Sequence, residues 1–233
     1  MKSEASIYKN PSLFKAILKI SKILQREPPA ICVETGTYRG EMTVEFSEIF
    51  EEVHTIELSE KWFQFSSKKL LDYPNVTCYL GDSAILVGKL SEKIDRPALF
   101  YLDAHFAGGD TALGEKEVPL MEELEVLTKR KQQDVFVIDD LRLIGKSGIS
   151  GIDGDSVYPL MEFDWESISL QSIRELLGSS KQNPWLIRND KIFVFRNLSR
   201  LKATLFPLVT ILVKLRDFFV LKPHRDQEST DQG

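Results

Sequence analysis

The feature that most constrains the fold of this chain is a short hydrophobic run that ends in an acid and leads into a turn with two glycines. The run reads Ile31-Cys-Val-Glu-Thr-Gly-Thr-Tyr-Arg-Gly40, and a helical pattern follows it. About twenty residues beyond the first glycine, a second run, His54-Thr-Ile-Glu57, also ends in an acid. Strand, turn, helix and strand in this order predict a βαβ unit, which places both strand ends at one edge of a parallel sheet.

The rest of the sequence continues this alternation. Strands are expected at 30–34, 53–57, 76–79, 98–102 and 134–138, and helices at 41–50, 60–71, 83–94, 118–130 and 167–177. Two further runs, 185–188 and 191–196, flank the turn pair Asn189-Asp190 and predict an antiparallel hairpin. We therefore predict an α/β fold: a doubly wound, Rossmann-like, mostly parallel seven-stranded sheet that ends in this hairpin and has helices on both faces.

The size of the chain favours one main domain. Of its 233 residues, 42% are hydrophobic, which is enough for one sizeable core. We expect residues 1–197 to form this domain, with a helix from residues 1–29 packed on the sheet. This helix begins at Asn10-Pro11, and the lysines within 7–24 exclude a signal peptide. Residues 198–233 are expected to form an amphipathic helix and a polar tail that is disordered from His224.

The C-terminal segment permits two interpretations. Residues 203–213 carry no charge, but eleven residues are too few to span a bilayer. Pro207 is expected to start or kink a helix, and from Leu208 the apolar positions share one face. We expect that face to pack on its own domain or on a second copy of the chain. A peripheral membrane contact through 203–221 is the alternative.

The overall charge and the cysteines limit the partners and the compartment. The formal net charge is −5, so nucleic acid is not an expected partner. Cys32 and Cys78 both lie in expected strands, which indicates two buried thiols and no disulfide framework. These features predict a protein of the reducing cytoplasm.

The glycine turn and the acids after the first three strands form a candidate nucleoside site. The G-x-x-x-G spacing of Gly36 and Gly40 does not match the dinucleotide fingerprint G-x-G-x-x-G. Glu57 stands where a carboxylate can accept hydrogen bonds from a ribose diol, although it could instead cap a helix beside Ser59. Asp82 could cap the next helix, contact the base of the nucleoside, or do both.

A second group of candidates follows the fourth and fifth expected strands. Asp103 and His105 end one run, and Asp139 and Asp140 end the other. Three carboxylates at one sheet edge are costly to bury unless a cation compensates their charge, and a hard divalent ion accepts oxygen ligands. His105 could be a further ligand or a general base. Alternatively, the acids could cap helices or pair with basic residues such as Arg142.

In these motifs, the chain resembles the class I S-adenosylmethionine-dependent methyltransferases. It is most similar to the metal-dependent O-methyltransferases, which include catechol and some sugar O-methyltransferases, over roughly residues 30–197. The resemblance implies an enzyme that transfers a methyl group from S-adenosylmethionine to a hydroxyl of a small-molecule acceptor, with Mg²⁺ or another divalent cation. The cofactor-binding residues it implies, together with the neighbours we add, are Glu34, Gly36, Thr37, Gly40, Glu57, Asp82, Ser83 and Asp103.

The same resemblance implies that Asp103, Asp139 and Asp140 bind the metal. Two positions depart from the family pattern, because Asp140 replaces an asparagine and Phe106 replaces the base lysine. His105 is therefore the expected catalytic base, beside Asp103. The loops 104–117 and 141–161 are expected to cover the site, and Tyr158, Asp164 and Trp165 could line the acceptor pocket.

Two alternatives keep the nucleoside site but change the function. In the first, the enzyme needs no metal and methylates a nitrogen or a carboxylate. In the second, the domain is catalytically silent, binds the nucleoside, and acts through its C-terminal helix.

Overall fold

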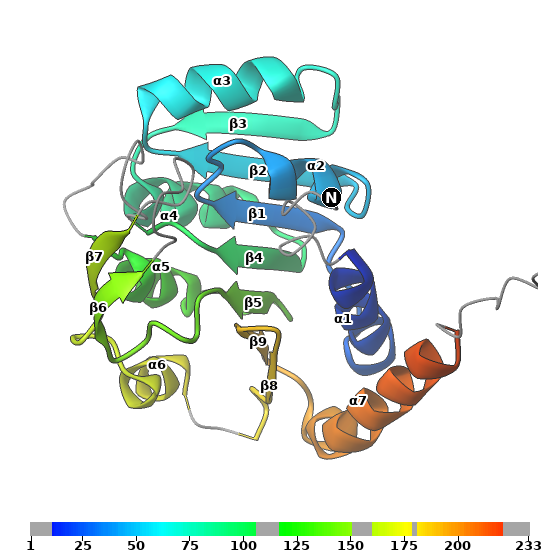
Figure 1. Cartoon of the computed structure of the whole chain (residues 1–233). Coiled ribbons are helices and arrows are strands. Elements are labelled where there is room, and N and C mark those ends of the chain that lie inside the picture. Colours follow the sequence, from blue (N-terminus) through cyan, green and yellow to red (C-terminus); the bar gives the residue numbers. More distant parts are fainter. Residues whose placement is uncertain (1–10, 106–116, 151–159, 179–180, 221–233) are drawn as a thin grey trace, which may run out of the picture.

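The computed structural model describes residues 11–105, 117–150, 160–178 and 181–220, and Figure 1 shows their arrangement. One seven-stranded sheet forms the centre of the molecule. Its strands are β1 (Ile31–Thr35), β2 (Glu52–Glu57), β3 (Val76–Leu80), β4 (Ala98–Leu102), β5 (Val135–Ile138), β8 (Trp185–Arg188) and β9 (Lys191–Phe195). The helices are α1 (Pro11–Leu24), α2 (Glu41–Ser47), α3 (Glu60–Leu70), α4 (Ser83–Lys93), α5 (Leu120–Leu127), α6 (Leu170–Leu177) and α7 (Arg200–Val220).

The strand order confirms the predicted fold class. The strands lie in the order β3-β2-β1-β4-β5-β9-β8. The first five run parallel to one another, whereas β9 runs antiparallel to both β5 and β8. The order reverses at β1, so the carboxyl ends of β1 and β4 border the crevice where open α/β sheets bind ligands.

Helices cover the sheet on both faces, as predicted (Figure 1). One core cluster joins the sheet to α4, α5 and α6, and a second joins it to α1, α2 and α7. Because of this double cover, every residue of β1, β4 and β5 is buried, and these strands are nearly continuous hydrophobic runs. Glu34 and Thr35 are the polar exceptions, and both lie at the end of β1 that faces the candidate site.

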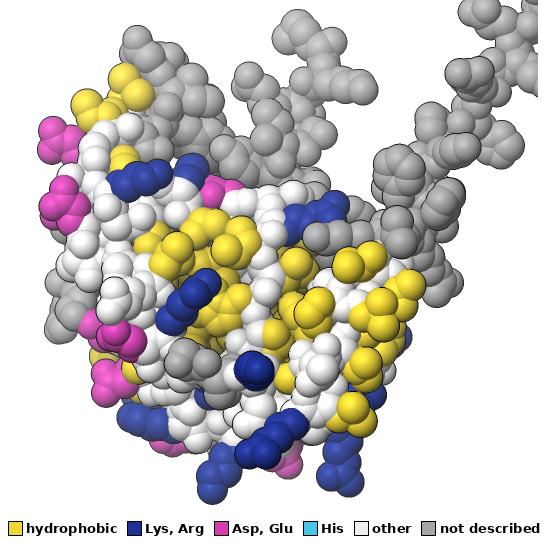
Figure 2. All heavy atoms as spheres, turned by 90° about the horizontal axis from the view of Figure 1, so that it is seen from below, with side chains coloured by type: hydrophobic (Ala, Val, Ile, Leu, Met, Phe, Trp, Pro, Cys, Tyr) yellow, Lys and Arg dark blue, Asp and Glu magenta, His cyan; other side chains and the backbone are white. Residues whose placement is uncertain are grey.

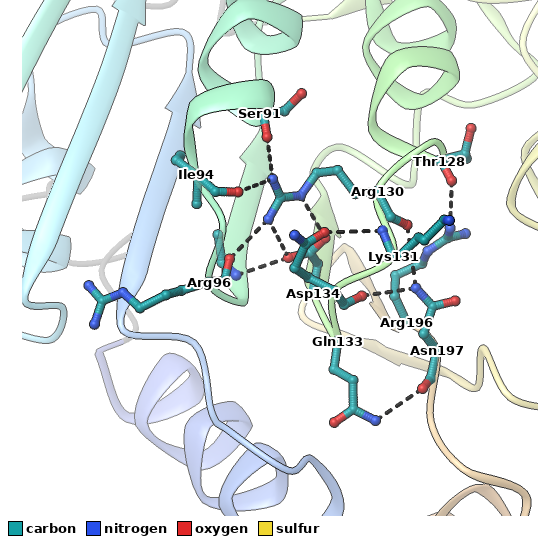
Figure 3. Close-up of polar contacts among 12 residues, drawn as sticks. Ser91, Ile94, Arg96, Thr128, Arg130, Lys131, Gln133, Asp134, Arg196 and Asn197 are labelled. Carbon is teal, nitrogen blue, oxygen red and sulfur yellow. Dashed lines mark hydrogen bonds and ion pairs between the residues drawn. The ribbon is translucent and has the colours of Figure 1, made fainter.

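The amino ends of β4 and β5 are joined by a buried ion pair (Figure 3). Nε of Arg130 lies 2.9 Å from Oδ2 of Asp134, and both side chains are buried. Arg130 also donates to the carbonyl oxygens of Ser91, Ile94 and Arg96 at the end of α4. Asp134 accepts from the amide of Ala98 at 2.9 Å. The network ties both strands to α4, at the edge of the sheet opposite the candidate site.

Two local expectations differ from the structure. The C-terminal helix begins at Arg200, so Pro207 lies inside it instead of starting it. Ala203, Phe206, Val209 and Val213 bury one face of α7 in the core, and this packing outweighs the hydrogen bond that proline cannot donate. Within the expected loop 141–161, β6 (Ser147–Ser150) pairs with β7 (Met161–Asp164) in a separate two-stranded sheet.

Three further findings bear on the remaining expectations. Both cysteines are free: Cys32 is buried and Cys78 is half-buried. No helix within the described ranges combines the length and hydrophobicity needed to cross a bilayer. Tyr158, most of the loop 104–117 and the tail from His224 lie outside the described residues.

Candidate active site

The glycine turn after β1 packs against the end of β4. Gly36 has a φ of 87°, and a Cβ at this position would lie 2.6 Å from the backbone carbonyl oxygen of Asp103. The amides of Gly36 and Thr37 both donate to the carbonyl of Ile56, at 3.0 and 3.2 Å. Only glycine therefore allows the turn to approach β4 this closely. The predicted cofactor turn and the predicted metal site thus meet at Asp103.

Glu57 binds the same turn from the neighbouring strand. Its Oε2 accepts from the amide of Tyr38 at 2.7 Å, and its Oε1 accepts from the amide of Ser59 at 2.8 Å. The side chain is buried, and burial raises the pKa of the carboxyl although these amides favour its ionised form. Ser59 is also the N-cap of α3. Glu57 is therefore not itself the helix cap, the role given above as its alternative; it holds the amide of that cap and the turn, at the strand end where a ribose-binding acid is expected.

Glu34 and Thr37 point into the domain beneath the turn. Thr43 and Thr55 donate to Oε2 of Glu34 at 2.5 and 2.7 Å, and the Thr55 hydroxyl lies 2.5 Å from that of Thr37. Burial raises the pKa of Glu34 to about 7. These two predicted cofactor residues form a hydrogen-bonded support that holds the turn in place.

Asp82 and Ser83 begin α4 beside Glu57. Oδ1 of Asp82 accepts from the amide of Ala84 at 2.8 Å, so the predicted capping role is present. The amide of Gly81 donates to the carbonyl of Glu57 at 2.8 Å, which joins the ends of β3 and β2. Ser83 is buried, and its hydroxyl hydrogen-bonds to Glu123.

Asp103, His105 and Asp140 form the acidic group at the carboxyl edge. Nδ1 of His105 lies 3.5 Å from Oδ1 of Asp103, and its Nε2 lies 3.1 Å from Oδ2 of Asp140. One potential ligand atom from each residue lies within 4.8 Å of the other two. Burial and the neighbouring carboxylates of Asp139 and Asp140 hold the pKa of Asp103 well above its usual range.

Asp139 lies outside this group of possible ligand atoms, whereas the sequence-based prediction counts it among the metal-binding residues. Its Oδ2 accepts from the hydroxyl of Tyr101 and pairs with Nζ of Lys191, while its Oδ1 accepts from the amide of Asp140 at 2.8 Å. Asp140 has a φ of 53°, so the chain turns sharply between the two acids and points them at different partners. Asp140 also pairs with Arg142, which realises the alternative considered above.

Asp103 and His105 of the acidic group, together with Asp139, line a small pocket between β4, β5 and α5. The pocket is lined by Leu102, Asp103, Ala104, His105, Val118, Leu120, Glu123, Ile138, Asp139 and Trp165. Trp165 was expected there, and its ring packs edge-on against His105 with the centroids 5.2 Å apart. Asp164 is not among the lining residues.

Glu123 is the site residue that sequence reasoning missed. It is buried, its pKa is raised to about 7 by burial, and it hydrogen-bonds to the side chains of Ser83 and Thr35. Its Oε1 has no hydrogen-bond partner within the described part of the chain, and neither has Nε1 of Trp165. The available signal was the position of an acid on the buried face of α5, between Leu120 and Leu127.

Comparisons with known proteins add similarities of fold at low identity. No protein-family model matches the sequence, and no curated protein matches it. An rRNA methylase from Streptococcus thermophilus is 14% identical, with a TM-score of 0.44 over 82% of this chain and 99% of the other. The SAM-bound amino pentose methyltransferase CalS10 from Micromonospora echinaspora, involved in calicheamicin biosynthesis, is 11% identical. Its TM-score is 0.49, over 82% of this chain and 92% of the other. The SAH-bound Podospora anserina methyltransferase PaMTH1 is 15% identical, with a TM-score of 0.49 over 83% of this chain and 81% of the other. At these identities and TM-scores, the likenesses concern the fold alone.

Proposed function

We propose that this chain is a methyltransferase that uses S-adenosylmethionine to methylate an oxygen of a small molecule, assisted by a divalent cation. The observation that carries the proposal is the contact between the Gly36 turn and Asp103. It joins the predicted nucleoside site, with Glu57 and Asp82, to the group of Asp103, His105 and Asp140. A methyl donor and an acceptor oxygen must lie side by side for transfer, and this edge of the sheet provides two adjoining sites.

The residues of the acidic group suit a divalent cation. Asp103 and Asp140 offer carboxylate oxygens and His105 offers a ring nitrogen, within 4.8 Å of one another. Burial, and after it the neighbouring carboxylates, raise the pKa of Asp103, so a bound cation would favour its ionised form. Because the set includes an imidazole, Mn²⁺ suits it as well as Mg²⁺. A bound cation supplies Lewis acidity, which favours loss of the acceptor hydroxyl proton.

The chain's own residues would position the acceptor and receive the proton that it loses. In methyl transfer, the acceptor oxygen bonds to the methyl carbon, the carbon–sulfur bond breaks, and the acceptor proton leaves. His105 can receive this proton if it is not itself a ligand. Oε1 of Glu123 and Nε1 of Trp165 offer the pocket an acceptor and a donor. Buried polar groups without partners are costly, so both favour a polar acceptor molecule.

A second candidate function is methyl transfer without a metal, to a nitrogen or a carboxylate. Basic or protonatable side chains already contact each acid: His105 lies between Asp103 and Asp140, Lys191 pairs with Asp139, and Arg142 pairs with Asp140. A protonated His105 would itself compensate the two carboxylates it contacts. Transfer that persists in EDTA would favour this candidate.

Calorimetric titration with S-adenosylmethionine tests the cofactor assignment. The parent is expected to bind, and Glu57→Ala is expected to bind at least about ten-fold more weakly, because a charged hydrogen-bond acceptor is lost. Glu60→Ala, which removes an exposed acid three residues away, is the matched control. Thermal unfolding of both variants separates loss of the site from loss of the fold.

The transfer itself can be tested without knowing the acceptor. The parent is incubated with a panel of small catechols, phenols and sugars, with Mn²⁺ or with EDTA, and S-adenosylhomocysteine release is measured by mass spectrometry. Release that depends on both an acceptor and the metal supports the proposal. Binding of the cofactor without release on any acceptor would favour the silent nucleoside-binding module.

A further inference from the structure

Helix α7 presents a hydrophobic face to solvent, which we call the α7 outer face. It consists of Leu201, Leu205, Leu208, Ile211 and Leu212. Leu201 is 70% exposed, and Leu208, Ile211 and Leu212 are each more than half exposed. The opposite side of the helix is buried in the core through residues 203, 206, 209 and 213. The helix is therefore anchored to the domain on one side and apolar on the other, an arrangement typical of an interaction surface.

Basic residues outnumber acidic ones in the sequences of α7 and α1. Helix α7 includes Arg200, Lys202, Lys214 and Arg216 and one acid, Asp217. Residues 11–27 include four further basic residues and one acid, Glu27, and Lys15, Lys19 and Lys22 lie exposed along one side of α1. The chain as a whole carries a net charge of −5, so these segments stand apart from the rest of its surface.

The two segments lie together in the fold. Nζ of Lys202 donates to the carbonyl oxygen of Ile23 at 2.7 Å, which joins α7 to the end of α1. Ile23 is itself about half exposed, so it adds to the apolar surface beside Lys22. Seen from below in Figure 2, hydrophobic side chains gather near the centre of the view and again on the right, where α7 lies in Figure 1. Lys and Arg border them, whereas most acidic side chains in that view lie toward the left edge.

We propose that the α7 outer face and the basic side of α1 dock this protein on a membrane surface that contains anionic phospholipids. Leucine and isoleucine side chains would enter the boundary between headgroups and acyl chains, while the lysines and arginines contact the phosphates. A face of this kind lies in the plane of the membrane and does not cross it. The proposal goes beyond the proposed methyl transfer and does not depend on it.

The charge pattern favours a lipid surface over a second copy of the chain. In a symmetric pair formed through α7, the same face meets itself, so basic residues from both copies come together. The four basic residues of α7 outnumber its one acid, Asp217, so most of them would lack an acidic partner in such a pair. Like charges placed together across an interface oppose association, whereas phosphates of anionic lipids neutralise them.

Vesicle co-sedimentation tests the proposal with the full chain. The parent is expected to pellet with vesicles of phosphatidylserine and phosphatidylcholine, and less with phosphatidylcholine alone. Leu208→Ser with Leu212→Ser is expected to lower the partition coefficient at least about ten-fold, because two leucines that would enter the membrane are lost. Lys15→Glu with Lys22→Glu is expected to lower it by about five-fold or more for each lysine.

Matched controls come from the other side of the molecule. Leu71→Ser with Ile85→Ser removes two apolar side chains that are at least as exposed as Leu208 and Leu212, from the region of α3 and α4. Lys89→Glu with Lys93→Glu reverses two exposed charges on α4. Both control pairs are expected to pellet like the parent. Far-ultraviolet circular dichroism and urea unfolding establish that every variant is folded.

Three results would overturn the proposal. In the first, the parent does not pellet with anionic vesicles. In the second, the α7 pair pellets as well as its control pair. In the third, sedimentation velocity shows a dimer that Leu208→Ser with Leu212→Ser dissociates, while no variant binds vesicles; the occupant of the face is then a second copy of the chain.

Discussion

Asp139 and Asp140 are neighbours in the chain, yet they have different electrostatic surroundings. Asp139 faces Lys191 and Tyr101, so its negative charge is compensated inside the protein. Asp140 faces His105 and the more exposed Arg142. The left-handed backbone at Asp140 separates the two side chains. At the scale of single residues, the two acids should therefore differ in their effect on metal binding.

Substitution of each acid by asparagine tests this difference. Asp140→Asn is expected to weaken Mn²⁺ binding by at least about ten-fold, because it removes a charged ligand. Asp139→Asn is expected to weaken binding less, because that carboxylate lies outside the group. Calorimetry with Mn²⁺ measures both affinities. Equal losses would contradict the assignment, as would the absence of Mn²⁺ binding in the parent.

Glu123 should make stability depend on pH. Its pKa is about 7 in the folded protein against an ordinary value of 4.5, so folding favours the protonated carboxyl. The stabilising contribution is complete below about pH 4.5 and is lost as the pH rises to about 7. Glu34 has a similar pKa of about 7 and should act in the same direction. The parent is therefore expected to unfold more easily at pH 7.5 than at pH 5.

Glu123→Gln should remove the part of this pH dependence of stability that comes from Glu123. Glutamine is neutral at both pH values, so the difference in unfolding free energy between pH 5 and pH 7.5 should shrink by up to about 3 kcal/mol. Urea unfolding at the two pH values measures it. The exposed neighbour Glu125→Gln is the control and should behave like the parent. An unchanged difference in Glu123→Gln would show that its carboxyl does not titrate in this range.

At the scale of elements, two glycines differ in whether their surroundings leave room for a side chain. Gly36 has a positive φ, and an added Cβ would collide with the carbonyl oxygen of Asp103 at the end of β4. Gly88 lies inside α4, where an added Cβ would lie 3.7 Å from Val126, an ordinary contact distance. The first glycine is required by the approach of two strand ends, whereas the second only lowers helix propensity.

Substitution by alanine should therefore change the unfolding free energy in opposite directions at the two positions. Gly36→Ala is expected to lower the unfolding free energy by about 2–4 kcal/mol and to weaken S-adenosylmethionine binding, because the turn must shift. Gly88→Ala is expected to raise it by about 0.5–1 kcal/mol. Urea unfolding gives both values. A Gly36→Ala variant as stable as the parent would show that the turn and β4 do not need this close approach.

The Arg130–Asp134 pair joins several elements and should matter more than a surface ion pair. Arg130→Ala leaves Asp134 buried without its charged partner, so the unfolding free energy is expected to fall by about 3–5 kcal/mol. Lys131→Ala, one residue away and exposed, is expected to change it by less than about 0.5 kcal/mol. Chemical denaturation measures both variants. A loss below about 1 kcal/mol in Arg130→Ala would mean that water satisfies Asp134.

At the scale of the whole molecule, the order of helices and strands could be predicted from the sequence, because the hydrophobic pattern of each segment agrees with its place in the alternation. The buried strands β1, β4 and β5 are hydrophobic runs of strand length, and the expected helices follow the strands in regular alternation. Helix α7 was placed less well, because its start depends on packing of Phe206 and Val209 in the core, which local sequence does not encode. The pairing of β6 with β7 likewise depends on contacts between distant residues.

The candidate site could be located from the sequence, but not its contacts. The edge of a parallel sheet collects whatever follows each strand, so Glu57, Asp82 and Asp103 were placed correctly at that edge. The direction of each side chain could not be predicted in the same way, because the sharp backbone turn at Asp140 separates it from Asp139. Glu123 was missed because it reaches the pocket from a helix and not from a strand end.

The packing of α1 beside α7 has a consequence for how this protein is made. The core cluster that holds Phe14 and Ile17 also contains Phe206 and Val209, nearly two hundred residues later in the chain. While the ribosome is still adding the residues between them, that face of the sheet has no final cover, and its hydrophobic side chains are exposed to other nascent chains. A synthesis pause before residue 200 should therefore leave a species that chaperones recognise, until α7 emerges and covers this face.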